Sequence, residues 1–302
     1  MYLQKIENYQ GEKMKTIHIN SRQLKKYKKL KLSKDIPNTE SIIYEMSDNK
    51  LLKVLFIKER ESLASKLYTV SLLSDYEEKI NIKELVIPQE LVSIDGLVSG
   101  FTIPYIKGEN LGEILKNPKV QTKTKIDLLK KIGLFIHKLE KSHSGNINFN
   151  FGDLHPYNIL VNKEGLHFID LDSSYLGTGY PQPGFYVSVS KELEKLPKKY
   201  NQNEKGIVIP NDNTDLYCYN MMILEFIAKE KIYRLKEEEL YDYLEYLREV
   251  GYCDRLLDSF QRLYTKANNI NPYECIDTLD DKLLGRGMYK VYEYLKNKPI
   301  VK

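Results

Sequence analysis

The sequence lacks several features that define large classes of proteins. Its 302 residues include no apolar run near the roughly 20 residues that a membrane-spanning helix needs. Its polar start, MYLQKIENYQGEKMK, differs from a secretory signal. The cysteines, Cys218, Cys253 and Cys275, are odd in number and widely spaced, which favours buried free thiols over a disulfide framework or a zinc site. We therefore expect a cytoplasmic protein with no membrane contact.

A strong excess of one charge is also missing. The chain has 46 Lys and Arg residues against 42 Asp and Glu residues, a net charge of +4, and its lysines are interleaved with glutamates. Because no domain-wide basic field results, nucleic-acid binding is not predicted. One basic run, KKYKKLKLSK at residues 25–34, is typical of a solvated strand or loop. The apolar content of 42% is enough for a large core, in one domain or in two lobes.

The first third of the chain has the pattern of strands around one helix. ESIIYEM and KLLKVLFI are β-rich runs separated by the turn residues 47–49, which predicts a hairpin. The segment ERESLASKLYTVSLLSD, which follows at once, is helical in pattern. ELVSIDGLVSGFTIPYI then predicts two more strands, with Asp95 and Gly96 as their turn.

The rest of the chain is mostly helical in pattern. TKTKIDLLKKIGLFIHKLEKSH carries apolar residues at helical spacing, and TDLYCYNMMILEFIAKE is nearly continuously apolar and predicts a central buried helix. We therefore predict an α+β protein with two lobes. Residues 1–106 form a β-rich N-lobe with one main helix, and they begin with a basic, polar segment at residues 1–34. Residues 107–302 form the mostly helical C-lobe.

Oxygen-bearing side chains surround two short strands in FGDLHPYNILVNKEGLHFIDLDS. The turn residues 162–165 join NILV to LHFIDL as a hairpin. Asp153 and Asn158 precede the first strand, and Asp170 and Asp172 end the second, so the hairpin brings distant oxygen ligands together. Oxygen donors without cysteine favour Mg²⁺, which completes its shell with phosphate oxygens. The alternative is that these are solvated turn residues.

These motifs and their order resemble the protein-kinase-like superfamily, which includes eukaryotic-type protein kinases and the aminoglycoside and choline phosphotransferases. GDLHPYNIL resembles the catalytic loop, with Asp153 as the catalytic aspartate and Asn158 as the metal-binding asparagine. FIDLD resembles the second metal motif, with Asp170 on the metal, and LLKVL has Lys53 where the family keeps its phosphate-binding lysine. TDLYCYNMMILEF is similar to the central helix of the large lobe, with Asp215 as its structural aspartate, buried against the catalytic loop.

The resemblance implies a bilobal fold and phosphoryl transfer from ATP with Mg²⁺. Lys53 would neutralise phosphate charge, Asn158 and Asp170 would hold Mg²⁺, and Asp172 would assist the metal. Asp153 would orient an acceptor hydroxyl and accept its proton. A lysine within a buried strand also favours a functional role over a solvated one, because an unpaired buried charge is unfavourable.

The resemblance also implies a nucleotide pocket. GFTIPYIKGENL resembles the hinge that receives adenine, which places Tyr105 and Ile106 at the nucleotide, together with Leu160 after the catalytic loop. The helix glutamate that pairs with the strand lysine in protein kinases would be Glu61, eight residues after Lys53. The alternative for Glu61 is an exposed glutamate in the first turn of a helix.

The sequence departs from the kinase pattern in two places. There is no glycine from Ile36 to Met46, where protein kinases have a glycine-rich loop over the phosphates. Backbone N–H groups and the hydroxyls of Thr39 and Ser41 could donate to phosphate there instead. Phe151 stands where the family has histidine, so we expect this side chain to pack in the core.

Three functions remain open. We favour a kinase acting on a protein hydroxyl, because Asp215 follows Asp170 by 45 positions, which leaves room for an activation-type segment that binds a protein substrate. A small-molecule phosphotransferase is the second hypothesis, since GDLH, with His155, resembles the antibiotic and choline enzymes. A nucleotide-binding pseudokinase is the third, favoured by the missing glycines.

Overall fold

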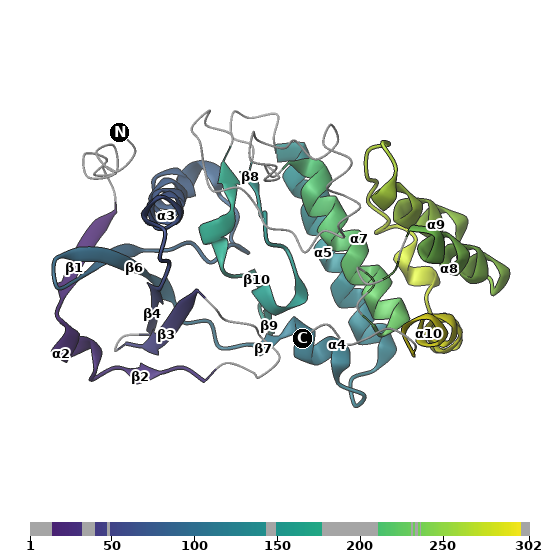
Figure 1. Cartoon of the computed structure of the whole chain (residues 1–302), viewed down its shortest axis with the longest axis horizontal. Helices are drawn as coiled ribbons and strands as arrows, with labels where there is room; N and C mark the ends of the chain where they lie inside the picture. Colours follow the sequence, from purple (N-terminus) through teal and green to yellow (C-terminus); the bar gives the residue numbers. More distant parts are fainter. Residues whose placement is uncertain are drawn as a thin grey trace. The chain divides into compact units, whose positions relative to one another are not determined.

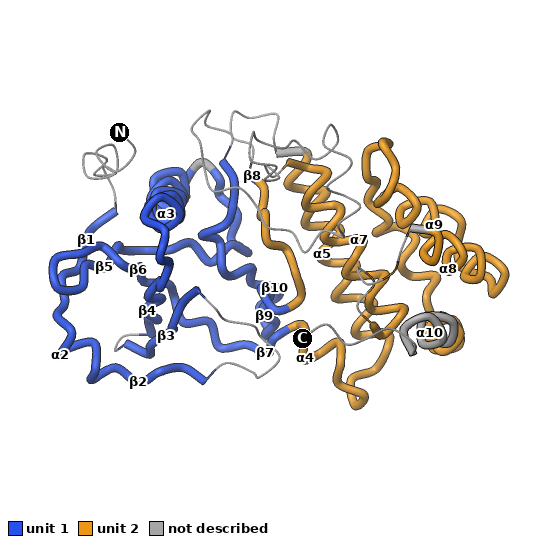
Figure 2. Tube along the Cα trace, viewed as in Figure 1, with its two compact units in different colours: residues 1–110, 146–149, 157–183 blue, residues 111–145, 150–156, 184–302 orange. Residues whose placement is uncertain are grey.

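The computed structural model describes residues 14–31, 40–46, 49–142, 149–176, 211–230, 232, 235 and 237–296. Most of the predicted activation-type segment therefore lies outside the described residues. The chain forms two compact units (Figure 2). The first comprises residues 1–110, 146–149 and 157–183, and the second comprises residues 111–145, 150–156 and 184–302. The predicted lobe boundary between residues 106 and 107 stays a prediction.

The first unit is built on a six-stranded sheet with the order β1-β5-β6-β4-β3-β2. Its strands are β1 (Lys15–Ile19), β2 (Lys28–Lys29), β3 (Ser41–Glu45), β4 (Lys50–Leu55), β5 (Glu90–Ile94) and β6 (Leu97–Pro104). Neighbouring strands are antiparallel except β1 and β5, which are parallel. Figure 1 shows this sheet beside the long helix α3 (Arg60–Ile80). The predicted β-rich region with one main helix is confirmed.

The strand connections follow the turn chemistry of the sequence. β3 and β4 pair as the predicted hairpin, with Ile43 opposite Lys53. β5 and β6 are joined by Asp95 and Gly96, whose φ angles are 49° and 87°. Both angles lie in the left-handed region, which glycine occupies freely and aspartate tolerates, so this turn closes without a bulky side chain in strain.

β4 is buried on both faces because its side chains alternate between two apolar clusters. The face toward α3 has a cluster of Leu55, Leu67, Val70 and Phe101, together with Met14. The opposite face has a cluster of Ile19, Tyr44, Leu52, Val54 and Val92. Burying each such side chain stabilises the unit by about 1.5–3 kcal/mol. Lys53 shares the parity of Leu55, so it points toward the α3 side.

The N-terminal segment contains elements that the sequence analysis did not predict. Within the expected polar segment, β1 joins the sheet edge and a short helix, α2 (Ser21–Leu24), follows it. Asn20 and Gln23 form a capping box at the start of α2. The missed signal was the alternation of Ile17 and Ile19 in KTIHI, which is typical of a half-buried strand.

The predicted oxygen-rich hairpin is confirmed in a three-stranded sheet with the order β10-β9-β7. Its strands are β7 (Glu109–Asn110), β9 (Ile159–Asn162) and β10 (Gly165–Phe168). Asn162 pairs with Gly165, whose φ of 133° closes the turn. After β10 come the 3₁₀ turn η3 (Leu171–Ser173) and the strand β11 (Tyr175–Leu176), and β8 (Phe149–Asn150) precedes the hairpin in the chain.

The second unit is helical, as predicted. Its helices are α4 (Leu111–Lys116), α5 (Thr122–Ser142), α7 (Asp212–Ala228), α8 (Glu237–Glu249), α9 (Asp254–Gln261) and α10 (Asp281–Lys296). α7 is buried along nearly its whole length and runs beside α5 (Figure 1). Tyr219 of α7 donates a hydrogen bond to the carbonyl of Leu129 at 2.9 Å. Gly133 permits this approach, because a Cβ there would lie 2.4 Å from the Tyr219 hydroxyl.

The cysteines and the helix lengths bear on the class of protein. All three cysteines are free thiols, and Cys218 and Cys275 are buried, while Cys253 is half-buried. Among the described residues, no helix has both the length and the apolar character that crossing a bilayer demands.

Candidate functional site

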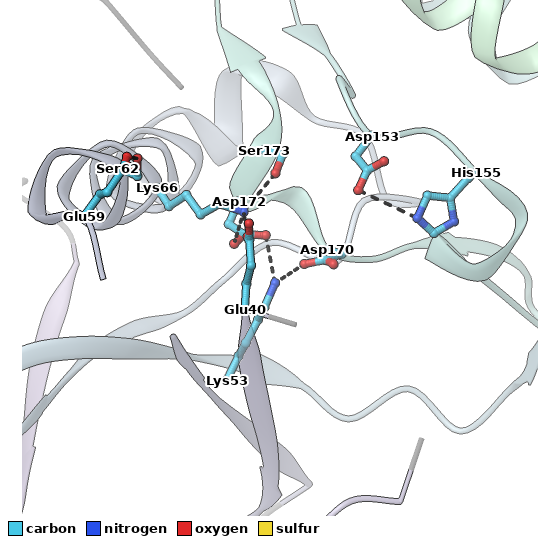
Figure 3. Close-up of polar contacts among 10 residues, drawn as sticks. All are labelled: Glu40, Lys53, Glu59, Ser62, Lys66, Asp153, His155, Asp170, Asp172 and Ser173. Atoms are coloured by element: carbon cyan, nitrogen blue, oxygen red, sulfur yellow. Dashed lines mark hydrogen bonds and ion pairs between the residues drawn. The ribbon is translucent and has the colours of Figure 1, made fainter. Parts of the chain in front are cut away.

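Lys53 is a buried lysine with two carboxylate partners in the first unit. Its ammonium contacts Asp170 directly and lies 2.9 Å from Oδ1 of Asp172 (Figure 3). The ammonium also lies 5.7 Å from the centre of the Phe101 ring, the residue opposite Lys53 on β6. Gly100 on the same strand permits close pairing with β4, since a Cβ there would lie 2.4 Å from the Lys53 carbonyl oxygen. The hairpin and β4 therefore bring the predicted lysine and two predicted metal residues together.

Asp170 stands at the end of the hairpin with an unusual backbone. Its φ of 64° lies in the left-handed region, and its side chain is 38% exposed. Such backbone conformations in residues other than glycine gather at functional sites. The N–H of Ile169 donates to the carbonyl of Asn158 at 2.9 Å, and the Asn158 side chain is buried. The backbone thus holds the two predicted metal residues on neighbouring segments of one hairpin.

Asp172 is enclosed between two lysines. Its side chain is only 1% exposed, with Oδ1 facing Lys53 and Oδ2 lying 3.4 Å from Nζ of Lys66. Lys66 projects from α3 and also contacts Ser173 Oγ at 3.2 Å and Glu40 at 3.1 Å. Both oxygens of Asp172 are therefore engaged by protein ammonium groups.

These contacts and burial together shift the pKa of each charged side chain in the cluster. Burial lowers the pKa of Lys53, but Asp170 and Asp172 outweigh it and raise that pKa, so Lys53 stays protonated. Burial likewise lowers the pKa of Lys66, and Asp172 reverses the shift. Burial raises the pKa of Asp172, yet the two ammonium groups hold it well below its usual range. Burial raises the pKa of Asp170 against the effect of Lys53, so Asp170 is the carboxyl that is protonated first.

The predicted pairing of Lys53 with Glu61 is replaced by its contacts with Asp170 and Asp172. Glu61 is exposed in the first turn of α3, as its alternative interpretation expected. The residue of α3 that faces the cluster is Lys66, which the sequence analysis missed. The sequence does contain a signal for Lys66. Lys66 lies three residues before Thr69 and four before Val70, so it shares a helix face with these two buried residues. A role of Glu61 at the nucleotide stays a prediction.

The residues present fit a magnesium ion. Asp170 offers a partly exposed carboxylate, and Asn158 offers an amide oxygen, both hard donors. The described residues hold no group of three His, Cys, Asp or Glu side chains placed for a metal ion. Two oxygen donors such as Asp170 and Asn158 suit Mg²⁺, which completes its shell with waters and phosphate oxygens. The two oxygens of Asp172 are already paired with lysines, so Asp172 is the poorest of the three predicted ligands.

The predicted hinge residues lie near the end of β6. Tyr105 is exposed, and its N–H donates to the carbonyl of Asn49 at 2.7 Å, while Ile106 is half-buried. Gly108 brings this segment close to β9, since a Cβ there would lie 3.3 Å from the Cβ of Leu160. The structure thus places the predicted hinge and Leu160 in one region of the first unit, and their contact with a nucleotide stays a prediction.

In the second unit, Asp215 supports the loop that carries Asp153. Asp215 accepts hydrogen bonds from the N–H groups of Phe151 at 3.0 Å and Gly152 at 3.2 Å. Its side chain is 3% exposed, and burial raises its pKa to about 7, against the effect of these two donors. The prediction of a buried, structural Asp215 is confirmed. Phe151 is buried too, with its ring centre 5.8 Å from that of Phe135, so the expected packing role is confirmed.

Asp153 follows a tight turn in this loop. Gly152 has a φ of 73°, and the N–H of Asp153 donates to the carbonyl of Phe151 at 2.9 Å. The half-buried Asp153 carboxylate lies 3.7 Å from Nε2 of His155 (Figure 3). The turn presents a carboxylate and an imidazole side by side, a pair that can accept and orient a proton.

The fold defined by these units is that of the protein kinases, with a β-rich N-terminal sheet and a helical C-terminal region. A solved structure of titin kinase and its flanking domains is similar to this chain, with a TM-score of 0.57 and 11% sequence identity. The similarity covers 98% of this chain and 58% of the titin kinase chain, so this chain spans less than two thirds of that structure. No protein-family model and no curated protein sequence matches the chain. The predicted protein-kinase-like fold is confirmed.

Proposed function

We propose that this protein is an ATP- and magnesium-dependent phosphotransferase. The observation that carries the proposal is the buried Lys53, which faces Asp170 at the end of the metal-motif hairpin within a kinase-like fold. A buried ammonium that stays protonated beside a partly exposed carboxylate can neutralise a phosphate and hold a cation in one place. Tyr105, Ile106 and Leu160 are the proposed contacts of the adenine.

The reaction needs an acceptor hydroxyl and a proton acceptor. The hydroxyl oxygen forms a bond to the γ-phosphorus of ATP, the bond from that phosphorus to the β–γ bridging oxygen breaks, and ADP leaves. The hydroxyl proton passes to the carboxylate of Asp153, which the backbone of Phe151 and Gly152 holds on a tight turn. Lys53 orients the phosphates and compensates their charge.

Asn158 and Asp170 are the residues that would hold Mg²⁺. The ion supplies charge neutralisation to the phosphates when it is bound. With the ion bound, Asp170 would give up its contact with Lys53, which its partly exposed side chain permits, and Lys53 would then contact phosphate.

We take the acceptor to be a protein, because of the long connection between the metal motif and α7. A small-molecule hydroxyl is the second candidate. It is favoured by His155, whose imidazole lies 3.7 Å from the Asp153 carboxylate and would contact a small acceptor bound to Asp153.

The test compares variants of three residues with different roles. Asp153→Ala should keep ATP and Mg²⁺ binding but lose on the order of 10² to 10⁴ in transfer rate, since it acts on the acceptor. Asp170→Ala should lose magnesium-dependent ATP binding and turnover together. Lys53→Ala should lower transfer because phosphate charge is poorly compensated. Asp258→Ala, an ion-paired surface aspartate on α9, serves as the control and should match the parent.

The assay uses labelled ATP with Mg²⁺, and both protein and small-molecule fractions are analysed. Label in protein supports the first candidate, and label in a small alcohol supports the second. A parent that binds ATP but transfers phosphate to no acceptor or water, with Asp153→Ala indistinguishable from it, would identify a pseudokinase.

A further inference from the structure

A second lysine, which is half-buried, lies beside Lys53, and the proposed function leaves it without a role. Lys66 lies on α3 with its side chain 16% exposed. Its partners are Asp172, Ser173 and Glu40 (Figure 3). These contacts join α3 to η3 and to the residue before β3, all within the first compact unit. The helix α3, the metal-motif loop and the start of β3 therefore meet at one ammonium group.

The two lysines share one carboxylate. Asp172 Oδ1 lies 2.9 Å from Lys53 and Oδ2 lies 3.4 Å from Lys66, and water has almost no access to either oxygen. A carboxylate this deeply buried needs charge compensation from the protein. Each lysine has a further acidic partner. Glu40, the partner of Lys66, is 59% exposed, so solvent screens its charge, whereas Asp170 contacts Lys53 directly. If Lys66 were absent, Lys53 alone would have to balance both Asp170 and Asp172.

We propose that Lys66 is a positioning residue that neutralises Asp172 and so leaves the charge of Lys53 available to nucleotide phosphates. The inference rests on the proposed function, because it takes Lys53 as the phosphate-binding lysine. Without Lys66, two carboxylates hold Lys53, and an approaching polyphosphate meets an uncompensated negative charge. Asp172 is then an anchor for two lysines, and Asp170 is the carboxylate left for Mg²⁺.

In this arrangement α3 contributes a side chain of the opposite charge to the one expected of a kinase-like helix. The resemblance predicted a glutamate from α3 as the partner of Lys53, but the anion comes from η3 and α3 supplies a cation. The bridge Lys53–Asp172–Lys66 links the same strand and helix through one intervening carboxylate. It therefore fixes Lys53 to α3 without a helix glutamate.

The experiment follows ATP binding by titration calorimetry with and without Mg²⁺. Lys66→Met should weaken ATP binding on the order of tenfold, which corresponds to about 1.4 kcal/mol. Lys66→Arg should bind like the parent, and the double variant Lys66→Met/Asp172→Asn should recover most of the loss because it removes both charges. Asp172→Asn alone should keep the parent's ratio of affinities with and without Mg²⁺. Lys50→Met is the matched control, a lysine of β4 on the opposite face, paired with Glu90 at 3.1 Å.

Three results would overturn the inference: parent-like ATP binding by Lys66→Met, no recovery in the double variant, or loss of magnesium dependence in Asp172→Asn. A double-mutant cycle of urea unfolding, measured without nucleotide, distinguishes failure of this inference from failure of the proposed function. If the parent binds no ATP, the proposed function fails, and the pairing is decided by the unfolding of Lys66→Met, Asp172→Asn and their double variant. Coupling of at least about threefold in the folding equilibrium constant supports the bridge, and additive effects refute it.

Discussion

Asp215 offers a test in which the pH dependence of stability reveals how a buried carboxyl is held. Its two oxygens accept hydrogen bonds from the N–H groups of Phe151 and Gly152, and both residues are buried. Each buried donor left unsatisfied destabilises a protein by about 1–3 kcal/mol. Asp215→Ala should therefore lower the free energy of unfolding by about 2–6 kcal/mol at pH 5, where the carboxyl is protonated in the folded protein.

Ionisation of Asp215 at higher pH should reduce the destabilisation that Asp215→Ala causes. Burial raises the pKa of Asp215 from 3.8 to about 7 in the folded protein. Between these values the folded state binds more protons than the unfolded state, so the free energy of unfolding falls as the pH rises. The full decrease is about 4 kcal/mol, since one pH unit corresponds to about 1.4 kcal/mol. About 3 kcal/mol of this decrease falls between pH 5 and pH 8, because pH 5 lies about two units below the folded pKa. The loss caused by Asp215→Ala should accordingly shrink to between about −1 and 3 kcal/mol at pH 8.

Asp215→Asn isolates the ionisation, because the amide cannot titrate and all other groups are shared with the parent. Urea unfolding followed by circular dichroism, from pH 4 to pH 8, gives the difference in free energy of unfolding between the parent and this variant. That difference should decrease with pH. Asp254→Ala, an exposed carboxylate in the first turn of α9, is the control and should cost less than about 1 kcal/mol. A parent that gains stability over Asp215→Asn as the pH rises would refute the reasoning, because the two N–H donors would then outweigh burial.

Two further predictions concern packing around the site elements. Gly100→Ala should lower the free energy of unfolding by about 1–3 kcal/mol, measured by urea unfolding, because its Cβ would lie 2.4 Å from the Lys53 carbonyl oxygen and would push β6 away from β4. An unchanged midpoint would contradict this close pairing. Tyr219→Phe should cost about 0.5–1.5 kcal/mol by the same measurement, since the buried 2.9 Å hydrogen bond from its hydroxyl to the Leu129 carbonyl is lost. A loss below about 0.5 kcal/mol would show that another donor replaces the hydroxyl.

Local patterns predicted most of the elements because their signals are contained within short segments. The turn residues Asp95 and Gly96 take up the left-handed angles that their chemistry permits, and the hairpin around Gly165 closes for the same reason. From Leu216 to Ala228, α7 is apolar in sequence except at Asn220 and Glu225, and nearly all of this stretch is buried in the structure. β1 was missed because an isolated five-residue strand in a polar segment gains its stability from parallel pairing with β5, which lies far away in the sequence.

The site shows more clearly than the fold what residue spacing in the sequence cannot predict. Motif order located Lys53, Asp170 and Asp172, and the structure joins them, because the hairpin and the central strand bring these residues together wherever the fold forms. The charge of Lys66 completes the cluster, and it could not be found by counting from Lys53 to the next glutamate. Which residue of α3 faces Lys53 depends on the rotation of the helix about its axis, and that rotation is set by the packing of residues such as Leu67 and Val70 against the sheet. Packing turns Lys66 inward and leaves Glu61 in solvent, so an acidic partner had to come from the loop after β10 instead.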